Sequence, residues 1–133
     1  LDAALRLAVA GALERHTFGS PLAERQGLRW VLADAATDLE ASRLLTARAA
    51  GLIDAGEDAI EAAAHAKKFA VRIAEHRLRD CMQVLGARGL RENCPIGRHL
   101  VGSRIANYVD GTTEMQNERI AASLLRRLAP GAG

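Results

Sequence analysis

Apolar residues recur along the start of the chain at the spacing of one helical face, which predicts a first helix over residues 1–15. The apolar positions of this segment are Leu1, Leu5, Ala8, Ala12 and Leu13. Ser20 followed by Pro21 is typical of an N-cap with proline at the first helical position, so a second helix is expected to begin there. Its apolar stripe continues to Ile53, and the Asp-Ala-Gly at 54–56 ends it.

A third helix is expected over residues 57–85, where apolar residues keep a seven-residue rhythm until Gly86 and Gly89 end the helix. The second and third helices are long and should pair antiparallel. Because their facing stripes are mostly alanine, their backbones can approach closely and burial is spread over many small contacts.

Two shorter helices follow. The pattern predicts a fourth helix over residues 96–109 and a fifth over residues 113–128, separated by an Asp-Gly pair. Thr112 or Thr113 is expected to cap the fifth helix, and Thr113 and Gln116 match the spacing of a capping box there. The tail at 129–133 is expected to fray.

The composition favours helices over a sheet. Of the 133 residues, 49% are hydrophobic but only 3% are aromatic, so alanine and leucine carry the apolar content. The length fits one domain. The sequence therefore predicts an all-α fold, an antiparallel four-helix up-and-down bundle with an additional short helix.

Charge and hydropathy narrow the class of partner. Eighteen lysines and arginines are interspersed with sixteen acidic residues, which leaves a net charge of +2 and no basic patch for nucleic acid or an anionic membrane. No apolar run approaches the roughly 20 residues that span a bilayer, and no signal peptide opens the chain. These patterns indicate neither a nucleic-acid nor a membrane partner.

The cysteines and histidines give no sign of a metal site. Cys81 and Cys94 lack CxxC spacing and are expected to be buried or free thiols in a reducing, cytoplasmic setting. His65, His76 and His99 have no partners at catalytic or metal-ligand spacing, so no role is assigned to them. The chain opens inside a predicted helix without an initiator methionine, which suggests an excised segment.

Three polar or glycine-rich segments punctuate the helices. RHTFG at 15–19, with Gln26 downstream, is similar to an R-x-x-F-G…Q motif. QVLGARG at 83–89, followed by Pro95, is similar to Q-x-x-G-G-x-G…P, and DGTTEMQ at 110–116 is similar to E-G-T-x-x-x-Q. In this order and spacing, across about nine tenths of the chain, the segments resemble the acyl-CoA dehydrogenase superfamily.

The resemblance implies a particular domain and chemistry. The chain would be the carboxy-terminal helical bundle of an FAD-dependent enzyme whose amino-terminal helical and middle β-domains are absent from this chain. Acyl-CoA would be the substrate, an electron-transfer flavoprotein or another acceptor would take the electrons, and the intact protein would be a dimer or a dimer of dimers. A freestanding helical interaction module is the alternative from another class.

The first two motifs carry the expected FAD contacts. The resemblance places Arg15 at the FAD pyrophosphate across a subunit interface, and Phe18 and Gln26 against the flavin cofactor. It places Gln83 and Gly86 at the adenosine of a neighbouring subunit's FAD. The residues alone allow simpler roles: Arg15 as a side-chain cap on helix carbonyls, Phe18 as a core anchor or hydrophobic staple, and Gly86 as a helix-ending residue.

The second motif departs from the family at one position. Ala87 stands where many members have the second glycine. The additional methyl group puts in doubt how closely the backbone approaches the nucleotide, but not the fold.

The third motif carries the candidate base. An Asp-Gly pair between helices is ordinarily a turn, but many family members have glutamate at the position of Asp110, which the resemblance makes the catalytic base for the α-proton. Val109 and Gly111 would then contact substrate, and Thr112 and Glu114 would contact the FAD adenosine and phosphates. From the residues alone, these last two cap the fifth helix and place a negative charge near its start.

Two alternatives to Asp110 as the base remain open. Aspartate is shorter than glutamate by one methylene, about 1.5 Å of reach, and geometry at that scale changes rates strongly. The base could instead come from the helix upstream of Leu1, or the chain could belong to a non-catalytic partner subunit.

The basic side chains of Lys67, Lys68 and Arg72 are interpreted as a solvated or intersubunit face.

Overall fold

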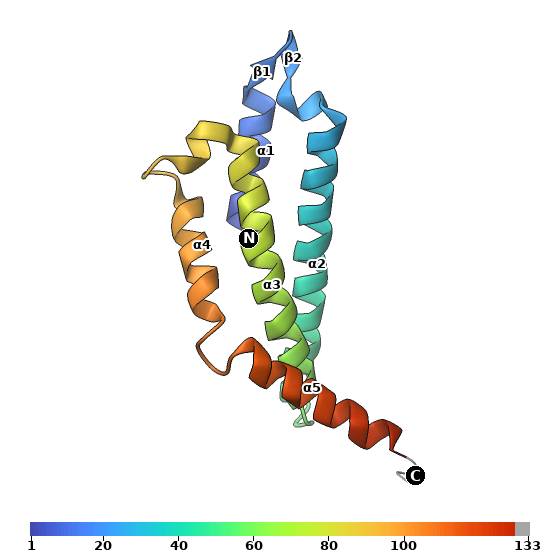
Figure 1. Cartoon of the computed structure of the whole chain (residues 1–133). Coiled ribbons are helices and arrows are strands. Elements are labelled where there is room, and N and C mark those ends of the chain that lie inside the picture. Colours follow the sequence, from blue (N-terminus) through green and yellow to red (C-terminus); the bar gives the residue numbers. More distant parts are fainter. Residues whose placement is uncertain (130–133) are drawn as a thin grey trace.

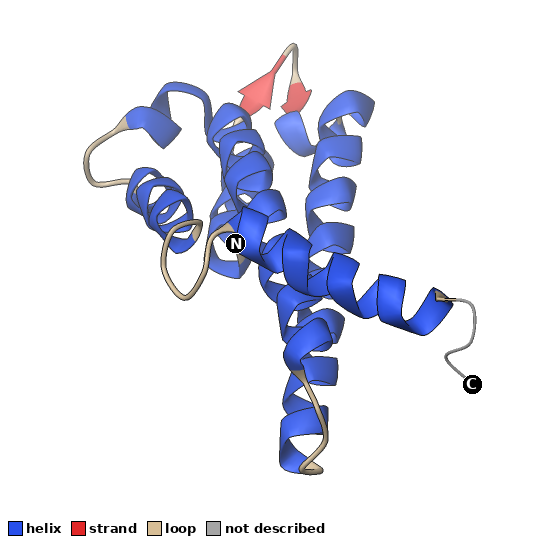
Figure 2. Ribbon diagram, turned by 60° about the horizontal axis from the view of Figure 1, so that its bottom comes forward, coloured by secondary structure: helices blue, strands red, loops and turns tan. Residues whose placement is uncertain are grey.

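The computed structural model describes residues 1–129, so the expected fraying at 130–133 lies outside the described residues. Its helices are α1 (Asp2–Glu14), α2 (Gln26–Asp54), α3 (Ile60–Leu85), α4 (Pro95–Ala106) and α5 (Thr113–Leu128). Helices α1 to α4 alternate in direction, whereas α5 crosses the bundle at a steep angle (Figures 1 and 2). The predicted all-α, up-and-down four-helix bundle with an additional helix is confirmed.

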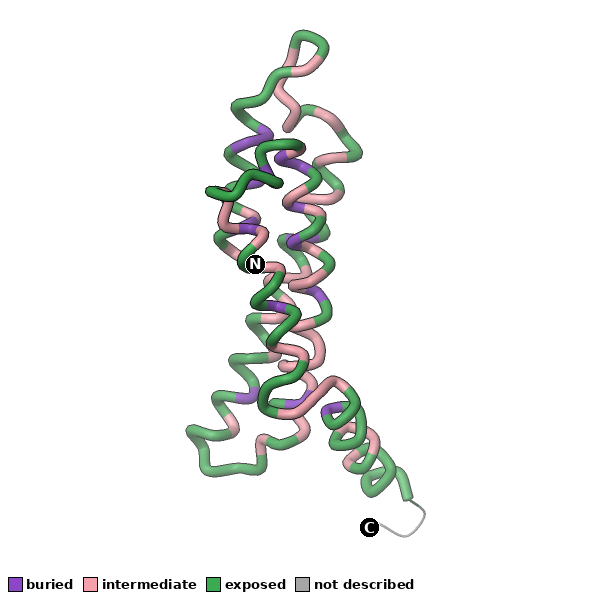
Figure 3. The backbone as a smooth tube through the Cα atoms, turned by 60° about the vertical axis from the view of Figure 1, so that its left-hand side comes forward, coloured by how far each residue is buried: buried purple, intermediate pink, exposed green. Residues whose placement is uncertain are grey.

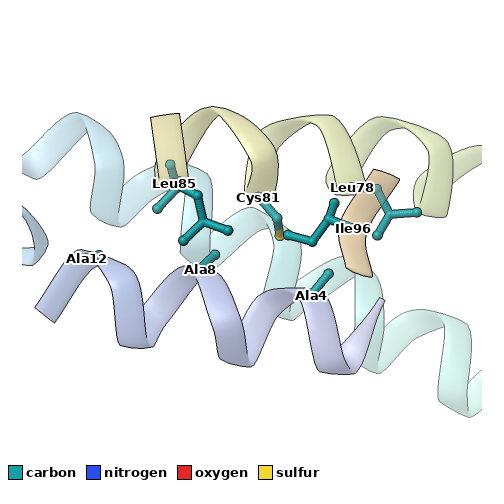
Figure 4. Packing of buried hydrophobic residues seen from close by; sticks show 8 residues of the cluster. Ala4, Ala8, Ala12, Leu78, Cys81, Leu85 and Ile96 are labelled. Atoms are coloured by element: carbon teal, nitrogen blue, oxygen red, sulfur yellow. The ribbon is translucent and has the colours of Figure 1, made fainter. Parts of the chain in front are cut away.

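The core lies where α1 packs on α3. The α1 residues Ala4, Ala8 and Ala12 are fully buried and face larger side chains of α3 and α4 (Figure 4). Those facing side chains include Leu78, Cys81, Leu85 and Ile96. A Cβ added at Gly11 of α1 would lie 2.5 Å from Leu85 Cδ2, so the helices approach as closely as small residues allow.

The two long helices pair antiparallel, as the sequence predicts (Figure 1). Arg77 of α3 joins them, with its Nε 2.6 Å from Asp38 Oδ2 of α2 and its Nη1 2.9 Å from Asp80 Oδ2. The Arg77 side chain is only 16% exposed, so this ion pair is more shielded from solvent than ordinary surface pairs.

The predicted start of the second helix at Pro21 is wrong. Phe18 and Gly19 both adopt positive φ, at 50° and 83°, as the two-residue turn of a tight hairpin requires. They join β1 (His16–Thr17) to β2 (Ser20–Pro21), and a short 3-10 helix (Leu22–Glu24) follows. The helix α2 therefore begins at Gln26, and Pro21 serves the hairpin instead of a helix start.

Two other predicted ends shift by about three residues. The third helix begins at Ile60 with Ala59 at its N-cap, and in the turn before it Asp58 Oδ1 accepts a hydrogen bond from the Ile60 N–H at 2.9 Å. The fourth helix ends at Ala106, not at residue 109. The turn that follows it contains two residues with positive φ, which a helix does not accommodate.

Buried positions lie along the inside of the bundle, whereas the hairpin and most of α5 are exposed or half-buried (Figure 3). None of the helices within residues 1–129 has the length and apolar content needed to cross a membrane.

Both cysteines are free thiols, and Cys81 is 1% exposed. Burial, together with the negative charge of Asp80, raises the pKa of the Cys81 thiol to about 11. Because the thiolate is the nucleophile, we expect Cys81 to resist iodoacetamide at pH 8 by about 100-fold relative to the unfolded chain. Mass spectrometry of protein alkylated with and without denaturant measures this protection.

Half-buried Cys94 provides the internal comparison for this experiment. Folded protein should carry label at Cys94 before Cys81, and denatured protein should carry it at both. Equal native and denatured rates at Cys81 would contradict the described packing. Raising the pH from about 9 toward 11 should destabilise the fold, because only the unfolded chain ionises this thiol freely in that range.

Candidate functional site

The five candidate FAD-contact residues taken from the first two motifs lie at one end of the bundle. There the β1–β2 hairpin follows α1, α2 begins and α3 ends (Figure 1). We call this cluster, made of Arg15, Phe18, Gln26, Gln83 and Gly86, the hairpin end. Gln26 is the first residue of α2 and Gln83 lies in the last turn of α3, both exposed to solvent.

Arg15 and Gly86 are in direct contact at the hairpin end. Gly86 has φ 60°, and a Cβ built on it would lie 2.8 Å from Arg15 Nη1. The backbone conformation therefore favours glycine, and an added Cβ would displace the flexible end of the Arg15 side chain. The backbone N–H of Arg15 closes α1 by donating to the Gly11 carbonyl at 3.0 Å, while its side chain has no hydrogen-bond partner within residues 1–129. The simpler reading of Arg15 as a side-chain helix cap is therefore wrong.

Phe18 occupies the tip of the hairpin and is 99% exposed. The guanidinium of Arg25 lies 5.7 Å from the centroid of its ring, and Arg25 also donates to the Thr17 carbonyl. This cation–π contact steadies the ring without burying it. The alternative of Phe18 as a core anchor or hydrophobic staple is wrong, because the hairpin carries it away from the core.

The glycine-rich segment after α3 forms a short 3-10 helix (Gly86–Leu90). Gly89 is needed for packing, since a Cβ there would lie 2.7 Å from the Met82 carbonyl oxygen. Arg88 Nη1 pairs with Glu14 Oε2 at 3.2 Å and so ties this segment to the end of α1. Ala87, the departure from the motif, is exposed and interferes with neither contact.

Asp110 lies in the turn between α4 and α5, at the opposite end of α3 from the hairpin (Figure 1). We call Val109, Asp110 and Gly111 the Asp110 turn. Asp110 is exposed and has φ 53°, and Gly111 has φ 94°. Lys67 of α3 donates to the carbonyls of Val109 and Gly111, and Gln116 of α5 donates to those of Asp110 and Gly111.

The predicted capping box of Thr113 and Gln116 is wrong. The other expected cap, Thr112, is confirmed as the N-cap, and its hydroxyl accepts from the Met115 N–H at 3.5 Å. The Gln116 side chain is 2% exposed and turns inward to the Asp110 turn instead of back to the helix start. Glu114 lies in the first turn of α5, as predicted for a charge near a helix start.

Glu114 carries its negative charge readily. Its own backbone N–H and the Thr112 hydroxyl hold the pKa of the Glu114 carboxyl below its usual value. An anionic side chain at a helix N-terminus is favoured by the helix dipole.

The role of Lys67 does not follow from the sequence pattern. Its ammonium group binds two carbonyls of the Asp110 turn, so the side chain is not freely solvated, and its place on an intersubunit face stays a prediction. Lys67 follows Ala64 and Ala66, which are buried, so it lies at the edge of the buried stripe of α3.

Two histidines lie one helical turn from a carboxylate. His65 Nε2 lies 3.6 Å from Glu61 Oε1, and His76 Nε2 lies 3.8 Å from Asp80 Oδ2. Across residues 1–129, no three His, Cys, Asp or Glu side chains are grouped to hold a metal ion.

The motifs and the bundle together match one family. The family model described as the C-terminal domain of acyl-CoA dehydrogenase matches residues 1–125. The chain belongs to the acyl-CoA dehydrogenase family. It is 42% identical over 123 residues to the human mitochondrial short-chain specific acyl-CoA dehydrogenase, a match that covers 92% of this chain and 30% of the human one.

Other relatives differ in their named reactions. The chain is 39% identical over 116 residues to the 3-sulfinopropanoyl-CoA desulfinase of Variovorax paradoxus, covering 87% of this chain and 29% of that enzyme. Butyryl-CoA dehydrogenase from Megasphaera elsdenii superposes with a TM-score of 0.91 at 34% identity, covering 94% of this chain and 33% of that one. The chain thus spans about three tenths of the length of the curated relatives it matches.

This acyl-CoA dehydrogenase C-terminal domain does not gather its motifs at one point. Lys67, which binds the Asp110 turn, precedes Gly86 of the hairpin end by 19 positions along α3. At 1.5 Å per residue the two places are about 28 Å apart. The structure therefore brings Arg15 to Gly86, and groups the residues from Val109 to Glu114, but it separates the two clusters.

Proposed function

We propose that this chain is the C-terminal domain of an FAD-dependent acyl-CoA dehydrogenase that oxidises an acyl-CoA thioester between its α- and β-carbons. The observation that carries the proposal is a solvent-facing carboxylate, Asp110, held in a left-handed turn within the family's third motif. Membership of the family does not favour a freestanding interaction module. The three relatives described above are named for CoA thioesters with short acyl groups.

The hairpin end fits a dinucleotide diphosphate. The Arg15 guanidinium is a planar donor fork with no carboxylate or carbonyl engaged within residues 1–129, and it lies over a glycine that leaves the backbone uncovered. Phe18 offers an exposed aromatic face. We propose that Arg15, Phe18 and Gln26 contact FAD bound across a subunit interface, with Gln83 and Gly86 at its adenosine. A solved relative, PigA, carries FAD in its complex.

The Asp110 turn supplies the acid–base chemistry in this proposal. The substrate Cα–H bond breaks, its proton passes to the Asp110 carboxylate, and the electron pair forms the new double bond. When bound, FAD accepts the β-hydrogen as hydride. Val109 and Gly111 line the acyl pocket beside the base, and Thr112 and Glu114 face the ribose hydroxyl or adenine amine of the nucleotide, groups that can donate to an acid.

The separation of the two clusters supports an assembly in which they serve different flavins. One subunit would place its Asp110 turn at its own flavin and its hairpin end at a neighbour's. Helix α2 exposes the large apolar side chains of Trp30 and Leu44, which self-association would cover. We therefore propose a homodimer or a dimer of dimers, with an electron-transfer flavoprotein or another acceptor as redox partner.

Expression of the complete reading frame that contains this chain tests the function. The purified protein should be yellow with bound FAD, and anaerobic butyryl-CoA should bleach the visible flavin band. Parallel addition of 3-sulfinopropanoyl-CoA, with analysis for released sulfinate, distinguishes dehydrogenation from desulfination. A colourless protein that neither binds added FAD nor reacts with either thioester would refute the proposal.

A further inference from the structure

Side-chain donors from two helices hold the Asp110 turn. Lys67 of α3 donates to the carbonyl oxygens of Val109 and Gly111, the latter at 2.7 Å. Gln116 of α5 donates to those of Asp110 and Gly111, at 3.3 and 3.1 Å. All three consecutive carbonyls of the turn therefore accept hydrogen bonds from side chains outside it.

The backbone conformation of the turn depends on such support. Asp110, with φ 53°, is in the left-handed region that residues with a Cβ rarely adopt, and such conformations persist where their surroundings hold them. Gly111 has φ 94°, and a Cβ on it would lie 2.8 Å from Gln116 Nε2. The buried amide of Gln116 thus packs directly on the turn.

Lys67 does more than cap the preceding helix. A lysine near a helix C-terminus ordinarily binds the helix's own last carbonyls, but α4 already ends at Ala106. The two acceptors of Lys67 lie three and five residues beyond that end, one on each side of Asp110. The ammonium group therefore brackets the one residue whose carboxylate is the candidate base.

We propose that Lys67 and Gln116 are positioning residues that fix the direction of the Asp110 carboxylate toward the substrate α-carbon. This inference rests on the proposed function of Asp110 as the base. Proton abstraction needs a carboxylate oxygen within hydrogen-bond reach of the substrate, and a misplacement of about 1 Å costs about 10²-fold in rate. Without the Lys67 donors, the turn can relax from the left-handed conformation and carry the carboxylate away.

The test is Lys67→Met in the intact flavoprotein, which keeps the apolar stem and removes the donors. Flavin reduction by saturating butyryl-CoA should slow about 10²-fold, while KM changes less than about threefold. Lys67→Arg, which keeps donors, should reduce flavin at least about tenfold faster than Lys67→Met. Lys68→Met is the matched control, because Lys68 makes no hydrogen bond to the turn in the described part of the chain.

A second readout does not depend on turnover. Hydrogen exchange followed by mass spectrometry should show faster exchange in the peptide over residues 107–115 of Lys67→Met, with the hairpin peptide unchanged. Gln116→Met should likewise slow flavin reduction and speed hydrogen exchange in the peptide over residues 107–115. Should Lys67→Met not fold, Lys67→Gln, which keeps one donor group, is measured in its place with the same expected direction.

The outcomes separate this inference from the proposed function. If Asp110→Asn stops flavin reduction but Lys67→Met reduces flavin at the wild-type rate, the positioning role is wrong and the base assignment stands. Unchanged exchange at 107–115 with a slowed reaction also overturns the positioning role. If Asp110→Asn itself reduces flavin normally, the proposed function of Asp110 fails first.

Discussion

Replacing Asp110 by asparagine in the intact flavoprotein is expected to slow flavin reduction by acyl-CoA about 10²–10⁴-fold while FAD stays bound. Asparagine has nearly the shape of aspartate and, like it, tolerates the left-handed conformation that Asp110 adopts at φ 53°. The turn and its carbonyl contacts should therefore survive, and only the proton acceptor is lost. Anaerobic stopped-flow absorbance of the flavin measures the rate.

Glu118→Gln is the matched control for this variant. Glu118 is an exposed carboxylate on α5, eight residues after Asp110, and has no proposed contact with flavin or substrate. Its loss should leave the rate within about threefold, the range of ordinary surface substitutions. If Asp110→Asn reduced flavin at the wild-type rate, the base would lie in another segment, such as a helix upstream of Leu1.

The second large effect is expected at the hairpin end. Gly86→Ala should weaken FAD binding about 100-fold, because alanine is strained at φ 60° and its Cβ would displace the Arg15 guanidinium that lies 2.8 Å away. The displaced guanidinium could no longer meet the diphosphate. Titration of the apoprotein with FAD, followed by flavin fluorescence, measures the change in Kd.

Gly97→Ala of α4 provides the comparison. A Cβ at Gly97 meets nothing within 4 Å, and alanine favours a helix, so FAD affinity should stay unchanged. Equal FAD affinity in Gly86→Ala and wild type would show that the Arg15–Gly86 contact only ends a helix. A parallel Arg15→Gln variant should lose affinity in the same direction without backbone strain.

Helical periodicity in the sequence predicts most of the fold, whereas the local turn residues predict it least well. The fifth helix has its predicted bounds, Thr113–Leu128, because Thr112, one of the two expected N-cap residues, caps it. Ser20 and Pro21 misled because the same pair suits a helix start and the second strand of a hairpin. The Leu22 N–H that donates to the Arg15 carbonyl at 2.7 Å favours the hairpin, and that contact leaves no periodic trace in the sequence.

The candidate site was predictable where motifs are local and not where contacts are long-range. Asp110 was placed on an inter-helix turn from its own neighbours in the sequence. Lys67 lies 43 positions earlier, on another helix, so nothing near either residue indicates that they meet. Gln116 lies near Asp110 in the sequence, but its spacing from Thr113 suggests a capping role. Its side chain turns inward to the Asp110 carbonyl, which excludes that role.

The structure of the intact protein with FAD and a CoA thioester tests the shared-site proposal most directly. The expected result has Asp110 of one subunit within hydrogen-bond reach of the substrate α-carbon, and Arg15 of a neighbouring subunit against the FAD diphosphate. Both clusters facing bulk solvent, far from any nucleotide in the assembled protein, would contradict it.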